Sequence, residues 1–331
     1  MRQQCFIATA FRVLVLITTA AIGSTAEAGD GPPRVGWLDF GAPDVARVQA
    51  LEQSLHNQGL VDGRTIVLER RSARGDTALL PRMAEELVRL NVSVILAPDP
   101  PSVTAARAAT NTIPIVMRVS SNPVAAGLIS SLAHPAGNIT GVYSASDELI
   151  GKRLEILREA IPGLARVAVL WDPGYEQSQS QFQFRQVQVA TQKIGLQLLS
   201  IEVRGPKPDF EAAVRRAVKR KAQALITLRN PRIVAATRSL AELTTRHRLP
   251  AMFDEQAFVQ SGGLMSYGTD LRDLYRHLAG YVDKILKGAN PGNLPVEQPT
   301  VFELVINLKT AKALGVKIPQ SMLQRADRLI E

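Results

Sequence analysis

Cysteine is almost absent from this sequence of 331 residues, in which Cys5 is the only one. Cys5 precedes the apolar run Val13–Gly23, so it cannot be the cysteine of a lipoprotein, which follows such a run. Beyond Cys5 the chain cannot form a disulfide, a thiolate zinc site or a cysteine nucleophile. With 46% hydrophobic residues it can fold by burying apolar surface alone, and its length favours two compact units.

Histidine is also scarce, and the four histidines are scattered along the chain. They are His56, His134, His247 and His277. No H-x-x-x-H pair occurs, and no carboxylate lies at metal-ligand spacing from them. No G-x-G-x-x-G or G-x-x-x-x-G-K-[ST] loop follows an apolar run, so a nucleotide-phosphate loop is missing as well. We therefore expect neither a metal nor a cofactor.

Aromatic residues make up only 5% of the chain, although its formal net charge is +9. The densest basic run is Arg215–Lys221, with Arg246, His247 and Arg248 further on. Single-stranded nucleic acid is bound by basic residues interleaved with aromatic ones, on which the bases stack. No aromatic residue interrupts these runs. They are typical of a solvated helix face, and we predict no nucleic-acid partner.

The sequence also lacks a complete nucleophile motif of a hydrolase. The segment "GLMSYG" (Gly263–Gly268) places Ser266 at the end of an apolar run that leads into a helix, as in a G-x-S-x-G elbow. Leu264 replaces the first glycine of that pattern, and the nearest later histidine, His277, falls on the following helix. We interpret Ser266 as an ordinary strand-end serine and predict that the protein is not an enzyme.

The N-terminus has the order of a secretory signal peptide. Arg2 and Arg12 precede the apolar run Val13–Gly23, and Ala26-Glu27-Ala28 is an A-x-A cleavage signal. The run is too short to cross a bilayer, which takes roughly 20 residues. This order favours a signal peptide, residues 1–28, over a buried N-terminal helix. We expect cleavage before Gly29 and location in the periplasm, without a lipid anchor.

Short apolar runs and amphipathic segments alternate from Arg34 onward. Because the runs are continuously apolar, they indicate parallel strands covered by helices on both faces. The pattern restarts near residue 146, so we predict an α/β fold of two Rossmann-like lobes. The first series of expected strands comprises residues 34–40, 65–71, 92–98, 113–120 and 139–145, with helices at 44–57, 77–90, from 102 and from 124. The second begins with a helix at 146–160, continues through strands and helices to the strand 262–268, and ends with a helix from 270, a strand at 301–307 and a helix at 308–314.

Polar and aromatic residues gather where the expected strands end. In open α/β sheets, ligands bind outside the carboxyl ends of the strands, where helix N-termini present their amides. Asp, Asn and Ser before a helix are also ordinary capping residues, and this alternative stays open for each residue taken singly. The candidates for ligand binding are Asp39, Phe40, Asp99, Ser102, Ser120, Ser121, Asn122, Asp172, Tyr175, Arg229, Asn230, Asp254 and Tyr267.

Two long segments resemble a known family. "GGLMSYG…DLYR…YVDKILKGANPGNLPVEQPTVFELVINLKTAKALGV" resembles the C-terminal signature of the tryptophan/tyrosine-type substrate-binding proteins of ABC transporters. "NPVAAGLISSLAHPAGNITGV" (Asn122–Val142) resembles the middle of the same proteins. The resemblance extends from about Arg34 to Glu331.

The resemblance implies a type I periplasmic binding fold, in which three crossover segments join two lobes that clamp a small ligand. Lobe 1 would comprise residues 34–145 and 270–290, and lobe 2 residues 146–269 and 296–331. Hinge residues would be Ser144, Gly268 and Pro295, so that the glycine after Ser266 has a mechanical role. The protein would be a monomer that delivers its ligand to an inner-membrane permease.

The resemblance also suggests how a zwitterionic ligand would be held, as hypotheses for single residues. Serines 102, 120 and 121, with helix N-termini, would hold its carboxylate. Asp39, Asp99 or Asp254 would meet its ammonium group, and Phe40, Tyr175 or Tyr267 would cover an apolar side chain. The chain departs from the family at three of these positions. Asp99 stands where the family has a small residue, Asn122 where it often has Asp, and Asp172 where it usually has Asn. An amino acid or related solute is therefore expected, but tryptophan is not specifically indicated.

Other functions remain open at this point. The same exported fold can pass its ligand signal to a membrane receptor instead of a permease. An exported enzyme on this scaffold would need catalytic motifs that the sequence lacks. A cytoplasmic regulator would carry a DNA-binding helix-turn-helix ahead of the first strand, where the signal sequence stands instead.

Overall fold

The computed structural model describes residues 31–41, 45–120, 122–144, 146–175, 177–298 and 300–331. The predicted signal peptide, residues 1–28, and Ser121 lie outside these ranges. The remainder, from residue 32, forms an α/β unit with two sheets, which confirms the predicted fold class of two lobes.

The first sheet has five parallel strands in the order β2-β1-β3-β4-β5. They are β1 (Arg34–Asp39), β2 (Val67–Ser72), β3 (Val94–Ala97), β4 (Ile115–Val119) and β5 (Ile139–Tyr143). Side chains along a strand alternate between its faces, so Trp37 packs on one side of β1 and Leu38 on the other. Both faces are apolar because helices cover both.

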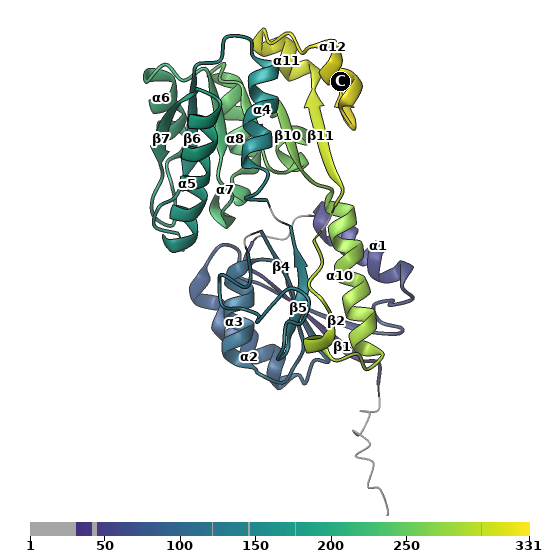
Figure 1. The fold of residues 1–331 in the computed structure, drawn as a ribbon. Coiled ribbons are helices and arrows are strands. Elements are labelled where there is room, and N and C mark those ends of the chain that lie inside the picture. The colour runs from purple at the N-terminus through teal and green to yellow at the C-terminus, as the bar shows by residue number, and fades with distance from the viewer. Residues whose placement is uncertain (1–30, 42–44, 121, 145, 176, 299) are drawn as a thin grey trace, which may run out of the picture. The chain divides into compact units, whose positions relative to one another are not determined.

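The helices α1 (Val45–Asn57) and α10 (Leu271–Leu286) cover one face of this sheet, and the 3₁₀ turn η1 (Thr77–Leu79), α2 (Leu80–Arg89) and α3 (Pro100–Ala109) lie with the other. Figure 1 shows α10 beside α1, although α10 follows a strand of the second sheet. The apolar stripe of α10 explains this position, since Leu274, Leu278 and Val282 are all buried in the core under α1.

The second sheet has seven strands in the order β12-β11-β10-β9-β8-β6-β7. They are β6 (Arg166–Trp171), β7 (Gln197–Glu202), β8 (Ala224–Thr227), β9 (Ala251–Phe253), β10 (Met265–Thr269), β11 (Phe302–Asn307) and β12 (Arg328–Ile330). One core lies under α4 (Ile150–Ala160), α5 (Gln177–Lys193), α11 (Leu308–Leu314) and α12 (Gln320–Arg325). The opposite core lies under α6 (Phe210–Lys219), α7 (Pro231–Ala235), α8 (Thr237–Arg246) and α9 (Gln256–Gln260).

The chain passes between the sheets three times. It leaves β5 through Ser144 and enters α4, it leaves β10 through Asp270 and enters α10, and it returns to β11 after the 3₁₀ turn η2 (Pro291–Asn293). On its return it runs beside β5, where the backbone of Glu297 bonds to Gly141 and Tyr143. The first sheet is thus completed by two segments from late in the sequence, the helix α10 and the short extended segment around Glu297.

Several expectations about single elements are wrong. No helix starts at Val124: the residues after Asn122 form a turn that ends at Gly127, whose φ of 66° is left-handed and stops a helix. The helix expected from Ser146 starts only at Ile150. The strand β12 was not anticipated, and β10 pairs with β11 antiparallel because the chain re-enters the second sheet from the opposite direction.

Candidate functional site

Asp99 joins the ends of β1 and β3 in the first lobe. One of its carboxylate oxygens accepts the backbone N–H of Ser102 at 2.9 Å, and the other accepts that of Phe40 at 3.0 Å. Asp99 is therefore the N-cap of α3, which was the alternative left open for it. Each oxygen already has one hydrogen bond, so an ammonium group would have to share the carboxylate with the backbone.

The other predicted residues of this lobe differ in exposure. Phe40, Ser102 and Ser120 are buried, whereas Asn122 is exposed and accepts the backbone N–H of Val124 and Ala125 in the turn that follows. The oxygen of Asp39 accepts the N–H of Gly41 at 3.0 Å. Asp39, Asn122 and Asp99 all make local backbone contacts of the kind that capping residues make.

Arg229 follows β8 and forms ion pairs with two carboxylates that follow β9 in the second lobe. Its guanidinium lies 2.9 Å from Oδ2 of Asp254 and 2.5 Å from Oε1 of Glu255. The three side chains are at most 14% exposed. Desolvated charges at this depth require partners, and here one cation is shared by two carboxylates. The neighbouring Asn230 caps α7 through the N–H of Ile233.

A second charged pair lies at the end of β6. Asp172 accepts a hydrogen bond from Arg232 at 2.7 Å and one from the N–H of Gly174 at 2.9 Å. The guanidinium of Arg232 also lies 5.6 Å from the ring centre of Tyr175, within cation–π range. Asp172 and Tyr175 are thus brought together by Arg232, a residue that was not predicted and that follows the Asn230-Pro231 helix start.

Two buried arginines were missed by the sequence analysis. Arg118 lies in β4 and is 4% exposed, and its Nη2 is 3.7 Å from Oε1 of Glu255. This ion pair joins the first sheet's lobe to the second's. Arg153, in α4, donates to the backbone oxygen of Tyr267 at 2.7 Å. For Arg118 the sequence carried a signal, because a charged residue inside an otherwise apolar strand is unusual; Arg153 lies in a helix with several other charged residues and had no such signal.

Two of the three predicted hinge residues, Ser144 and Pro295, lie on segments between the sheets, whereas Gly268 lies within a strand of the second sheet. Ser144 donates its backbone N–H to the oxygen of Val119 at 2.9 Å, and Pro295 accepts the hydroxyl of Tyr281. Gly268 lies in β10, where a Cβ atom would stand 2.0 Å from the backbone oxygen of Asp254. Close approach of two backbones therefore explains this glycine. Whether these residues act as hinges stays a prediction.

Some buried polar atoms at the strand ends have no hydrogen-bond partner within the described part of the chain. They are Ser102 Oγ, Thr227 Oγ1 and Asp254 Oδ1. Such atoms commonly mark places where a water or a ligand completes the hydrogen bonding. Within the same part of the chain, no three His, Cys, Asp or Glu residues are placed to hold a metal ion.

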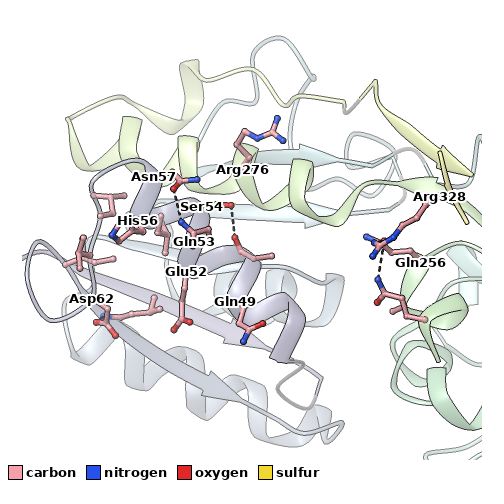
Figure 2. Close-up of a pocket in the computed structure, with 18 residues that line it drawn as sticks. Gln49, Glu52, Gln53, Ser54, His56, Asn57, Asp62, Gln256, Arg276 and Arg328 are labelled. Carbon is pink, nitrogen blue, oxygen red and sulfur yellow. Dashed lines mark hydrogen bonds between the residues drawn. The ribbon is translucent and has the colours of Figure 1, made fainter. Parts of the chain in front are cut away.

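The hollow drawn in Figure 2 is a different feature. It measures about 990 Å³ and runs along α1, with α9, Arg276 and Arg328 at its edge. Gln53 is bonded to Asn57, and Arg328 to Gln256 at 3.3 Å. None of the predicted binding residues is among those described as lining it. Its lining comes mainly from α1 and the residues just after it, together with Gln256, Ala257 and Gln260 of α9.

Comparison with known proteins decides the family. Residues 43–330 match the family described as "ABC transporter substrate binding protein". The chain belongs to this family. It is therefore a substrate-binding protein of an ABC transporter and not an enzyme, as predicted. Ser266, the residue that resembled a nucleophile, is a buried residue of β10.

Relatives of this substrate-binding protein include a tyrosine-binding protein of Clostridioides difficile, 27% identical over 80% of this chain and 75% of the relative. A conserved domain protein from Vibrio cholerae is 26% identical with a TM-score of 0.80, covering 90% of this chain and all of that one. A domain from Streptococcus pneumoniae in complex with L-Trp is 23% identical, also with a TM-score of 0.80, covering 91% of this chain and all of that one. These likenesses agree with the fold described above.

No helix among the described residues is long and apolar enough to cross a membrane. The predicted signal peptide falls outside those residues, and export to the periplasm remains a prediction.

Proposed function

We propose that this substrate-binding protein takes a free amino acid with an apolar or aromatic side chain and delivers it to an ABC permease. The observation that carries the proposal is the pairing of Arg229 with Asp254 and Glu255 at the strand ends. A zwitterion presents one charge of each sign, and these residues offer guanidinium and carboxylate groups within one contact distance.

The relatives support the same class of ligand. One is a tyrosine-binding protein, and a second is known in complex with L-Trp. In this chain the ring of Tyr175 lies 5.6 Å from the guanidinium of Arg232, and the half-buried ring of Tyr267 lies 6.2 Å from that of Phe302. Rings in this position can cover an apolar side chain while the charged ends are held by the polar groups.

The mechanism follows from the connectivity. The predicted residues belong to both lobes, and a ligand that touches both stabilises the form in which the lobes are closed on it. The closed form would then dock on the permease, so that binding and delivery are coupled by one conformational change. Export through a cleaved signal peptide, residues 1–28, would place the protein on the outer side of the membrane.

A thermal-shift screen of the purified protein tests the ligand class. L-tyrosine, L-tryptophan, L-leucine, dipeptides and sugars should be compared, with D-tyrosine as the matched control. A ligand that binds only the folded state adds about 2.7 kcal/mol at a hundredfold excess over its Kd. For a chain of this size the expected shift in Tm is roughly 4 °C. A response to sugars alone, or an equal response to both tyrosine enantiomers, would contradict the proposal.

Uptake distinguishes delivery from sensing. A strain without the gene should lose import of the radiolabelled ligand and regain it with the wild-type protein. Unchanged import, with loss of a ligand-dependent response instead, would contradict delivery and indicate a receptor partner. Mass spectrometry of the protein recovered from the periplasm should show loss of residues 1–28, and a full-length mass would contradict the signal peptide.

A further inference from the structure

Arg153 occupies an unusual position for a charged residue. It lies on the inner side of α4, the first helix after the chain leaves β5, and is only 5% exposed. Its neighbours on the same side of the helix, Ile150, Leu154 and Leu157, are apolar members of the core. A buried guanidinium costs desolvation free energy unless its N–H donors find acceptors, so Arg153 requires hydrogen-bond partners in the interior.

The donors of Arg153 bind two separate crossover segments. Nη1 donates to the backbone oxygen of Ser146 at 3.0 Å, and Nη2 donates to the hydroxyl of the same serine at 2.9 Å. Nε donates to the backbone oxygen of Tyr267 at 2.7 Å. Ser146 belongs to the first passage between the sheets, and Tyr267 stands at the end of β10, just before the second.

The acceptors are neutral, and the charge is balanced from further away. Burial lowers the pKa of the Arg153 guanidinium, while the carboxylates of Asp254 and Asp147 act in the opposite direction. Asp147 is itself held by Gln183 at 2.8 Å. The planar fork of an arginine can serve three acceptors in two directions at once, whereas a lysine ammonium offers a single point of attachment.

The contact with Tyr267 reaches the charged residues of the site. The next residue, Gly268, lies against the backbone oxygen of Asp254, so the end of β10 and the end of β9 cannot move independently. Asp254 and Glu255 in turn bind Arg229. A displacement of Tyr267 would therefore be passed to the carboxylates that face the ligand in the proposed function.

We propose that Arg153 is a positioning residue of the hinge, which fastens the first crossover segment to the second so that the two bend as one when the lobes close. This inference rests on the proposed function, because it concerns the closure that the ligand stabilises. Buried charges contribute little net stability compared with apolar side chains of the same size. The effect of Arg153 should therefore appear in the geometry of the lobes more than in the stability of the fold.

The distance between the lobes in the ligand-free protein provides the test. Spin labels at Glu85→Cys in α2 and Arg238→Cys in α8, in a Cys5→Ser background, lie on side chains that are 61% and 87% exposed. Double electron–electron resonance should give a broader distribution for Arg153→Lys than for the parent protein. Arg158→Lys is the matched control, since Arg158 lies in the same helix and donates to the backbone oxygen of Ile194 at the surface.

A second variant covers the case in which Arg153→Lys does not fold. Ser146→Ala removes only the hydroxyl that accepts from Nη2, and it should broaden the distribution to a lesser degree. If either variant is folded by circular dichroism and keeps the parent distribution, the proposal is wrong.

Binding of L-tyrosine and L-tryptophan gives the second readout, by isothermal titration calorimetry. Arg153 does not touch the ligand, so its loss acts through the population of the binding-competent form: a tenfold lower population in Arg153→Lys weakens binding about tenfold, and Arg158→Lys should bind as the parent does. Failure of the parent to bind either amino acid would count against the proposed function alone, because the distance measurement needs no ligand. Unchanged distances together with normal binding would overturn the role of Arg153 alone.

Discussion

The backbone oxygen of Asp254 lies so close to Gly268 that a Cβ atom on this glycine would stand 2.0 Å from it. A non-bonded Cβ atom essentially never comes within 3.0 Å of another heavy atom, so either β9 or β10 would have to move if the glycine were replaced. The close approach also packs the end of β10 directly against the carboxylate-bearing end of β9. A glycine at the end of a strand marks such an approach as often as it marks a flexible joint.

Gly268→Ala should therefore destabilise the protein by about 1–3 kcal/mol, the usual range for forcing an extra carbon into packed structure. Urea unfolding measures this difference. Gly280→Ala is the control, because Gly280 lies inside α10 with open space at its Cβ position. Alanine is the better helix former, so that control should gain roughly 0.5–1 kcal/mol. Equal effects of the two substitutions would contradict the role of close packing at Gly268.

Asp99→Ala should destabilise the protein by roughly 1–2 kcal/mol, because the carboxylate caps α3 and holds the N–H of Phe40. Asp209→Ala removes the equivalent cap of α6, far from the predicted binding residues in sequence, and should cost a similar amount. Asp99→Asn keeps an oxygen for the cap but loses the charge and the acceptor for the N–H of Phe40. If Asp99→Asn unfolds like the parent yet binds amino acids more weakly, Asp99 meets the ammonium group. If Asp99→Asn binds amino acids with the same affinity as the parent protein, Asp99 does not meet the ammonium group.

Arg229→Met should be the most destabilising of these substitutions, by about 3 kcal/mol, because it removes the cation of the buried Asp254 carboxylate and leaves Glu255 with the more distant Arg118. Adding Asp254→Asn to Arg229→Met removes one of those carboxylates and should restore part of the loss. A double-mutant cycle by urea unfolding measures the coupling between the two residues. Strictly additive losses would show that Arg229 and Asp254 do not stabilise each other.

Tyr143 should contribute a pH dependence in the alkaline range. Burial raises the pKa of its phenol, and the hydrogen bond to Glu148 at 2.9 Å acts in the same direction. The unfolded chain releases this proton near the ordinary tyrosine pKa of about 10, whereas the folded protein retains it. The contribution to stability is thus present below about pH 10 and is lost as the pH rises further. The free energy of unfolding should fall less steeply there in Tyr143→Phe, and parallel curves would contradict this.

The elements of the fold were largely predictable because their signals are local. The continuous apolar runs correspond to buried parallel strands, and the stripe from Leu271 to Leu286 corresponds to α10. Capping also follows from the sequence: Asp209 and Asn307 each accept the expected backbone N–H at their helix starts. The false helix at Val124 had similar composition, but Gly127 adopts a left-handed conformation that no periodicity reveals.

The site was predictable only in its location. The strand ends follow from the order of elements, so Asp99, Asp172, Arg229 and Asp254 could be nominated. Their partners could not, because Arg232 meets Asp172 from a different βα unit, and Arg118 and Glu255 come from different sheets. Pairings of this kind depend on distances between segments far apart in the chain.

The sequence by itself determined the two βα series, the helix caps, the candidate strand ends and the resemblance to a family, because each depends on the order of residues along the chain. Only the tertiary structure decided which charges neutralise one another, why Gly268 must be glycine and where Arg153 directs its donors. Those outcomes depend on desolvation and on contacts within a few ångströms between distant segments. Local sequence patterns therefore predict the fold, whereas the chemistry of the site depends on pairs of residues that are far apart in the sequence.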